Sequence, residues 1–180
     1  MSSLLMARAA MLLRRFRGSR RGSAAIEFAM VAPIFFGLLF AIIETAFMFF
    51  AGQVLETAVQ DSARLILTGQ AQNASYSSAQ FKTALCGKLS SLFDCNGVYV
   101  DVRSYGSDFS TVSIVPPIDA NKKFVNTMQY NPGTAGQIVV VRAFYQWPLF
   151  VTGLGYNIAN LTDSKRLLTA TAAFRNEPYN

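Results

Sequence analysis

The segment Gly22-Ser-Ala-Ala-Ile-Glu27-Phe28 is the most informative part of this sequence. It stands between a cluster of arginines and a long apolar run, so it joins a candidate cleavage signal, a candidate membrane span and a carboxylate available for charge pairing. It also separates a short cationic N-terminus from the rest of the sequence.

The net charge of +6 comes from 16 basic and 10 acidic residues among 180, and its surplus lies entirely before Gly22. From Ser23 onward the basic and acidic residues balance. An arginine block directly before an apolar run indicates retention on the cytoplasmic side of a membrane. A nucleic-acid partner would instead require basic residues spread over a folded domain, so none is expected. The surplus arginines are Arg8, Arg14, Arg15, Arg17, Arg20 and Arg21.

Residues 28–43 contain no charged side chain, and as a helix they would cover about 24 Å. If the helix extends to Gly52, it covers about 38 Å, which exceeds the ~30 Å hydrocarbon core. We therefore predict one transmembrane helix, residues 23–52, with the arginines in the cytoplasm and the C-terminal part outside. A secretory signal peptide is the alternative, but its apolar part is shorter and ends in small residues, whereas this run ends in Phe47-Met-Phe-Phe50.

Gly22 and Glu27 each suggest a chemical role. Glycine lets a peptidase draw the chain into an extended conformation, and cleavage after Gly22 would leave Ser23 as a new ammonium. An unpaired charge in hydrocarbon is costly, so the Glu27 carboxylate of one subunit has reason to pair with the N-terminus of a neighbour. The plainer interpretation is a flexible glycine, an N-cap serine and a first-turn carboxylate favoured by the helix dipole. The order of all these features together favours processing.

Two further residues in the apolar run bear on packing. Pro33 removes one backbone donor and crowds the carbonyl of Ala29, which predicts a kink or local opening that would let a packed helix bend. Glu44 lies on a different helix face from Glu27, so the two cannot form one site. Glu44 either contacts another subunit within the membrane or reaches for water at its outer surface, and both interpretations remain open.

Three segments together resemble TadE-like pseudopilins, the minor pilin-like proteins of the tight-adherence branch of the type IV pilus machinery. The resemblance is close over residues 18–68. The segments are Gly22-Ser-Ala-Ala-Ile-Glu27-Phe28-Ala-Met-Val-Ala-Pro33, the apolar run to Ile43-Glu44, and Asp61-Ser-Ala-Arg64.

The resemblance implies cleavage by a prepilin peptidase after Gly22, with Gly22, Ser23, Glu27 and Phe28 as the processing residues. Glu27, Pro33 and Glu44 would be the subunit-packing residues. It further implies insertion in the bacterial inner membrane, a periplasmic C-terminal domain and a role in building an adhesive pilus. The implied partners are the peptidase, other pilin-like subunits and the inner-membrane assembly platform. With about 125 residues beyond the span, the chain suits a minor component better than the bulk subunit, and whether it enters the extracellular filament stays open.

The helix is predicted to continue outside the membrane over residues 53–69, because apolar and small residues recur at helical spacing. This stripe indicates the core face of a domain rather than a docking face, and Gly69 is the expected stop. Residues 70–78 are polar and predict a loop, followed by a second amphipathic helix with Ser77 or Ser78 as N-cap. The stripe is Leu55, Ala58, Val59, Ser62, Ala63 and Ile66; the second helix would bury Phe81, Ala84, Leu85, Leu89 and Leu92.

Cys86 and Cys95 are the only cysteines, and their expected position outside the membrane predicts a disulfide between them. Metal ligation is the alternative, but two cysteines in a chain without histidine make a poor zinc site. We expect no metal and no cofactor.

The sequence from residue 98 onward alternates with the period of a β-strand. Strands are predicted from residue 98 to residue 103 and over residues 111–115, 137–147 and 165–175, giving a three- or four-stranded antiparallel sheet packed on a helix. The expected fold is thus α+β and pilin-like, with a leader over residues 1–22 and a head over residues 70–180. The long loop at residues 117–136 suits partner binding. Tyr145, Trp147, Phe150 and Tyr156 are expected to pack under a loop rather than form an exposed patch.

An enzyme is the competing class. Without histidine the chain lacks the usual base for a serine or cysteine nucleophile, and it has no glycine-rich phosphate loop. Five aspartates are expected in or beside turns, where aspartate is common: Asp94, Asp101, Asp108, Asp119 and Asp163. We therefore predict no catalysis and no small-molecule substrate. The alternative function is an unprocessed, single-span adaptor or sensor, which keeps the topology but discards cleavage.

Overall fold

The structure of the protein is a computed structural model that describes residues 22–89, 91–152 and 156–179. The predicted arginine leader lies outside these residues. The chain divides into two units, with the boundary between Ile42 and Ile43. The first unit contains the apolar N-terminal part of a long helix, and the second is an α+β head, as predicted.

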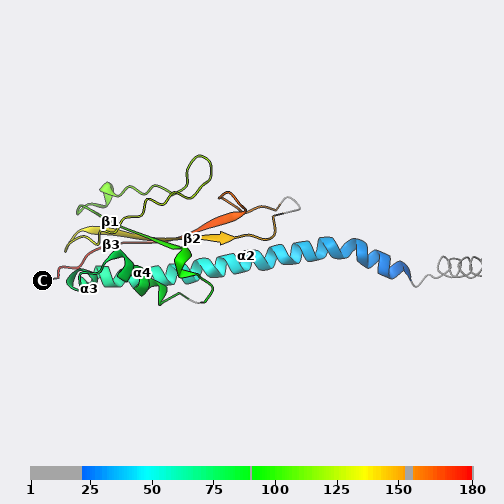
Figure 1. Ribbon diagram of the computed structural model, residues 1–180, viewed down its shortest axis with the longest axis horizontal. Helices are drawn as coiled ribbons and strands as arrows, with labels where there is room; N and C mark the ends of the chain where they lie inside the picture. The colour runs from blue at the N-terminus through cyan, green and yellow to red at the C-terminus, as the bar shows by residue number, and fades with distance from the viewer. Residues whose placement is uncertain (1–21, 90, 153–155, 180) are drawn as a thin grey trace, which may run out of the picture. The chain divides into compact units, whose positions relative to one another are not determined.

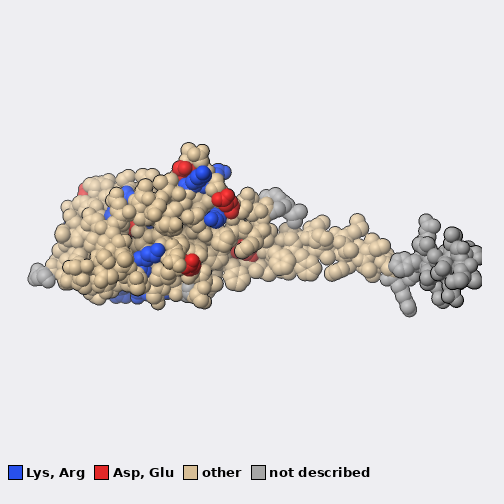
Figure 2. Space-filling model, viewed as in Figure 1, with Lys and Arg blue, Asp and Glu red and all other residues tan. Residues whose placement is uncertain are grey.

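Helix α2 (Ser23–Leu67) begins directly after Gly22 and runs for 45 residues. In its N-terminal part the large apolar side chains are exposed, with Phe28 at 66% and Met30 at 73%. On the face shown in Figure 2 this part carries no visible charged side chain, whereas basic and acidic side chains are mixed over the head. Within the described residues α2 is the one helix long and apolar enough to cross a membrane. The helix continues through Pro33.

The C-terminal part of α2 packs on the sheet, as Figure 1 shows. The predicted stripe is buried along its whole length, from Leu55 at 0% exposed to Ile66 at 0%. Burial begins earlier than the stripe, because Met48 and Ala51 already belong to the same core. The prediction that the stripe forms the core face of a domain is confirmed.

Helix α2 ends at Leu67, and Gly69 turns the chain with a left-handed φ of 75°. A Cβ at this position would lie 2.4 Å from the ring of Tyr179, so backbone conformation and close approach both require glycine. The one-turn helix α3 (Gln70–Asn73) follows, which corrects the prediction of a plain loop. A turn of helix forms here because the Gly69 carbonyl accepts the N–H of Asn73 at 2.9 Å.

The second predicted helix is α4 (Ser78–Cys86). Ser77 is its N-cap and forms a capping box with Gln80. Phe81 and Leu85 are buried as expected, whereas Leu92 lies beyond the helix and is 36% exposed. The helical face therefore ends earlier than its apolar spacing indicated.

Strands β1 (Val98–Tyr105), β2 (Ile138–Pro148) and β3 (Lys165–Arg175) form an antiparallel sheet in the order β1-β2-β3. One face packs against the helices (Figure 1). The other face lies under the long β1–β2 connection, whose Phe124 contacts Tyr99 and Phe144. The head therefore has three layers: helices, sheet and connection.

The predicted strand over residues 111–115 is wrong. Phe109–Thr111 form the 3-10 helix η3, and the residues after it join no strand. The edge of β1 is instead occupied near Val102, whose N–H donates to the Gln129 carbonyl and whose carbonyl accepts from Asn131, both at 2.8 Å. Because this edge of β1 pairs with a later segment near Val102, residues 111–115 do not extend the sheet there.

The expectation that Asp101 lies in or beside a turn is also wrong. Asp101 lies in the middle of β1, directly opposite Arg142 of β2, and its side chain is fully buried. A carboxylate on an alternating strand is normally solvated, but the β1–β2 connection covers this face of the sheet.

Candidate processing and assembly site

Gly22 is exposed at the start of α2. No described heavy atom lies within 4 Å of the position that a Cβ would take, and φ is not in the left-handed region. The fold itself therefore does not require glycine here. A requirement for glycine at residue 22 would have to come from another molecule that reads this peptide.

Ser23 and Glu27 lie one helical turn apart, and the Ser23 hydroxyl donates to Glu27 Oε1 at 2.8 Å. Glu27 is exposed, and it lies in the first turns of the helix, where the helix dipole favours a negative charge. Among the described residues the ion pairs all involve Asp101, so Glu27 has no cationic partner there. The carboxylate is thus directed at the residue that would carry a new ammonium after cleavage.

Phe28 and the apolar residues that follow present a continuous uncharged surface up to Ile42. Water does not solvate such a surface favourably, so it requires a bilayer or neighbouring helices. Pro33 lies within it and is also exposed. These residues can therefore anchor and pack, but they carry no group for acid–base chemistry.

The Glu44 carboxylate lies in the head and holds the chain that follows β2. Oε1 accepts the N–H of Phe150 at 2.5 Å, and Oε2 accepts the N–H of Val151 at 3.1 Å. The hydroxyl of the next helix residue, Thr45, contacts the hydroxyl of Tyr156. The structure thus gives Glu44 a contact within the chain that neither interpretation of this residue included.

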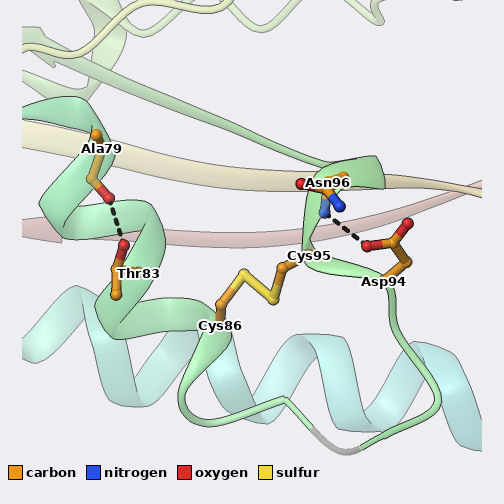
Figure 3. Close-up of a disulfide and its surroundings, with 6 residues drawn as sticks. All are labelled: Ala79, Thr83, Cys86, Asp94, Cys95 and Asn96. Carbon is orange, nitrogen blue, oxygen red and sulfur yellow. Dashed lines mark hydrogen bonds between the residues drawn. A yellow bond between two sulfur atoms is a disulfide. The ribbon is translucent and has the colours of Figure 1, made fainter.

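The disulfide between Cys86 and Cys95 is confirmed, with a Cα–Cα distance of 6.0 Å (Figure 3). Cys86 ends α4, and Cys95 begins the 3-10 helix η2 (Cys95–Gly97), which Asp94 caps by accepting the N–H of Asn96 at 3.0 Å. The bridge therefore joins the end of α4 to the start of β1. No group of three or more metal-binding side chains occurs in the described part of the chain.

The aromatic residues at the end of β2 are partly as expected. Phe93 packs its ring edge-to-face with Tyr145 at 4.9 Å and with Trp147 at 6.1 Å, between centroids, so these two rings lie in the core layer. Phe150, by contrast, is 86% exposed. Its position two residues after the strand-ending Pro148 was the one local signal that it would leave the core.

The family model described as TadE-like protein matches residues 22–64. The match begins at Gly22 and includes Glu27, Pro33 and Glu44, and it confirms the resemblance found in the sequence. It is consistent with a TadE-like protein of the Tad system, associated with a pilus and anchored by its N-terminal helix. The head beyond residue 64 lies outside the match. Neither a curated protein nor a solved structure matches the chain.

Proposed function

We propose that this chain is a pilin-like subunit of a Tad-type adhesive pilus, made as a precursor and cut by a prepilin peptidase between Gly22 and Ser23. The observation that carries the proposal is the match to the TadE-like family, which starts at Gly22. The exposure of Gly22 and the open space around it support access by a peptidase. Its role is structural and not catalytic.

The chain is anchored in the inner membrane by α2, with the leader in the cytoplasm and the head in the periplasm. Met48 and Ala51 already belong to the head's core, which supports a span that ends near Phe47 rather than at Gly52. From Ser23 to Phe47 a helix still covers about 38 Å, enough to cross the ~30 Å hydrocarbon core. The disulfide between Cys86 and Cys95 suits an oxidising periplasm.

Cleavage removes the cationic leader and creates an ammonium at Ser23. In the assembled pilus the Glu27 carboxylate of one subunit pairs with the ammonium of the next, because both charges are costly to leave unpaired among apolar helices. The exposure of Glu27 supports this pairing, since an exposed carboxylate can be reached from a neighbouring subunit. The pairing would define how far neighbouring helices are displaced along the filament axis.

Pro33 and Glu44 contribute to packing among these helices. Pro33 leaves one carbonyl of the preceding turn without its usual donor, which lets α2 bend as subunits come together. The partners are other Tad pilin-like subunits and the inner-membrane assembly platform.

Intact-mass measurement of the protein purified from membranes tests the proposal. In cells with the prepilin peptidase we expect a mature chain starting at Ser23, and in cells lacking the peptidase a precursor that retains residues 1–22. A chain that is functional while it retains residues 1–22 in peptidase-positive cells would overturn processing. That result would favour an unprocessed single-span adaptor or sensor.

A further inference from the structure

The connection that follows β2 is held against α2 at the point where the uncharged run of the helix ends. Glu44 is the first charged residue after residues 28–43, and its carboxylate accepts the N–H groups of Phe150 and Val151. The contact between Thr45 and Tyr156 attaches the same connection a second time. Residues 149–152 therefore lie at the level of the helix where an anchor leaves the hydrocarbon core.

This connection carries the most exposed large apolar side chain among the described residues, Phe150 at 86%. Beside Glu44 on α2, Ile43 is 41% exposed and Phe47 is 53% exposed. The Glu44 hydrogen bonds bring the connection and this part of the helix together, so the three apolar side chains occupy one level of the head. Large apolar side chains exposed at one level of a protein can enter the boundary between the headgroups and the acyl chains of a bilayer.

Two cations lie at the end of the sheet from which residues 149–152 leave. In the sheet register Lys165 lies opposite Pro148 and Arg166 lies opposite Trp147, so both begin β3 at the end of the sheet next to residues 149–152. Arg166 also donates to the carbonyl of Ile158 at 2.7 Å, and both cations are half-exposed. Apolar side chains beside basic ones are the combination that binds the headgroup region of a bilayer containing anionic lipid.

We propose that residues 149–152 form a bilayer-contact loop, in which Phe150 enters the lipid interface beside α2 and Glu44 holds the loop there. The inference rests on the proposed function in one respect, that α2 spans the membrane. The loop gives the head a second attachment beside its anchor, which restricts its orientation before assembly. A subunit that leaves the bilayer for a filament must withdraw Phe150 from lipid.

The test uses single-tryptophan reporters in the full chain, reconstituted in vesicles of phosphatidylcholine and phosphatidylglycerol with brominated acyl chains. Trp147, the only tryptophan, is first changed to phenylalanine, and the reporters F150W, F35W and F109W are then made singly. Phe35 lies in the proposed span and Phe109 at the opposite end of the sheet; each is 57% exposed. Phe109 is therefore a control for the general affinity of tryptophan for interfaces.

We expect bromine quenching and a blue-shifted emission for F150W and F35W, and neither for F109W. Quenching of F35W without quenching of F150W would overturn the loop contact while leaving the membrane span intact. Absence of quenching at both would overturn the span and the loop contact together. A third outcome is a blue shift of F150W that occurs only in assembled pili, without quenching in vesicles. That result would show that residue 150 contacts a neighbouring subunit, and it would overturn the lipid contact.

The role of Glu44 is tested by adding E44A to the F150W reporter. We expect a loss of quenching, because the N–H groups of Phe150 and Val151 lose their acceptor. The matched control is E56A, which removes a carboxylate of the same helix that accepts the N–H of Thr171 at 3.3 Å, away from the loop. Equal quenching in the E44A and E56A variants would overturn the holding role.

A second measurement avoids the W147F substitution in case that variant does not fold. Benzoylphenylalanine placed at residue 150 or residue 109 of the otherwise unchanged chain is irradiated in the same vesicles. Lipid adducts at residue 150 alone support the inference. Adducts at neither position, or equal adducts at both, contradict it.

Discussion

Asp101 Oδ2 lies 2.6 Å from Arg142 Nη2, and the two side chains are 0% and 6% exposed. The pair also holds the β1–β2 connection at two points. Asp101 Oδ1 accepts the N–H of Gln129 at 2.8 Å, and Arg142 Nη1 donates to the Val115 carbonyl at 2.9 Å. Arg103 donates its Nε–H to the same carboxylate at 2.9 Å. The buried Asp101–Arg142 pair thus joins two strands to both halves of a long connection.

Replacing Asp101 with asparagine should destabilise the head strongly. Removing one partner of a buried ion pair leaves the other charge uncompensated, which costs about 3–5 kcal/mol. The measurement is the free energy of unfolding of the full chain in detergent micelles. The control is D163N, because Asp163 is exposed and its positive φ of 61° is one that asparagine tolerates. Equal stability of the two variants would contradict the structural role of Asp101.

Replacing Cys86 and Cys95 together with serine should lower the free energy of unfolding by about 2–3 kcal/mol, as the chain-entropy model gives for a loop of this size. The two cysteines are 9 residues apart in sequence, and the bridge joins α4 to the start of β1. Unfolding with and without reductant measures the effect. The parent should lose stability on reduction, whereas the double variant should not respond to reductant at all. If reductant leaves the stability of the parent unchanged, the disulfide is contradicted.

Removing the Tyr130 hydroxyl should leave the free energy of unfolding almost unchanged. The hydroxyl is buried without a hydrogen-bond partner among the described residues, while its ring packs 5.7 Å from that of Phe81. In Y130F the ring stays and an unsatisfied polar group is removed. The control is Y105F, because the Tyr105 hydroxyl donates to the Ser113 carbonyl at 2.8 Å; its loss should cost about 1 kcal/mol or less. A lower stability of Y130F than of Y105F would contradict the conclusion that the Tyr130 hydroxyl is buried without a hydrogen-bond partner.

Tyr130 should also affect how the free energy of unfolding depends on pH in the alkaline range. Burial, and secondarily the neighbouring Tyr76, raises the pKa of Tyr130 above the ordinary 10.0. Because the folded-state pKa exceeds the unfolded one, the contribution of Tyr130 to stability is complete below pH 10.0 and is lost as the pH rises through the raised value. Unfolding measured against pH should therefore show a shallower alkaline decline in Y130F than in the parent. Identical declines would show that Tyr130 does not titrate in this way.

Changing Gly22 to alanine should block processing without affecting the fold. The position has room for a Cβ, so the substitution leaves the head unstrained, but it adds a side chain where a peptidase must grip the chain. Intact mass should show accumulated precursor. The control is G52A, at a second glycine of the helix region with no atom within 4 Å of its Cβ position; it should be processed normally. Normal maturation of G22A would remove the glycine requirement.

Changing Glu27 to glutamine should impair pilus assembly more than it impairs cleavage by the peptidase. The amide keeps the size of the side chain and still accepts the Ser23 hydroxyl, but it cannot neutralise the ammonium of a neighbouring subunit. We expect mature chain in membranes and a loss of piliation, assayed by electron microscopy. The control is E177Q, at an exposed glutamate of the head, which should assemble as the parent does. Normal piliation of E27Q would refute the pairing.

Features that depend on residues close together in the sequence were predicted correctly. The buried stripe of α2, the Ser77 cap and the Cys86–Cys95 bridge each depend on spacing within a few turns of chain. The Gly22-to-Phe28 element is of the same kind, since together with the apolar run and Asp61-Ser-Ala-Arg64 it resembled the family whose model matches residues 22–64. Local spacing determines which side chains share a helix face, and no distant contact is needed to infer it.

The errors arose where distant segments compete for one partner. Residues 111–115 alternate like a strand, but Gln129 and Asn131 occupy the edge of β1. Which of the two segments pairs with β1 depends on packing between residues far apart in the sequence. Asp101 was expected in or beside a turn, because the layer that buries it comes from a later part of the chain and local sequence does not show it. Phe150 looked like a core residue because the sequence does not say that Glu44, 106 residues earlier, holds its backbone outside the core.

Hydrophobicity and charge along single stretches of chain were enough to predict the long apolar helix, the Gly22-to-Phe28 element and the approximate content of helices and strands. The partners of Asp101, Glu44 and Phe150 could be assigned only from the folded structure. Each of those depends on which segment covers which face of the sheet, and that choice is made by the summed packing of residues far apart in sequence.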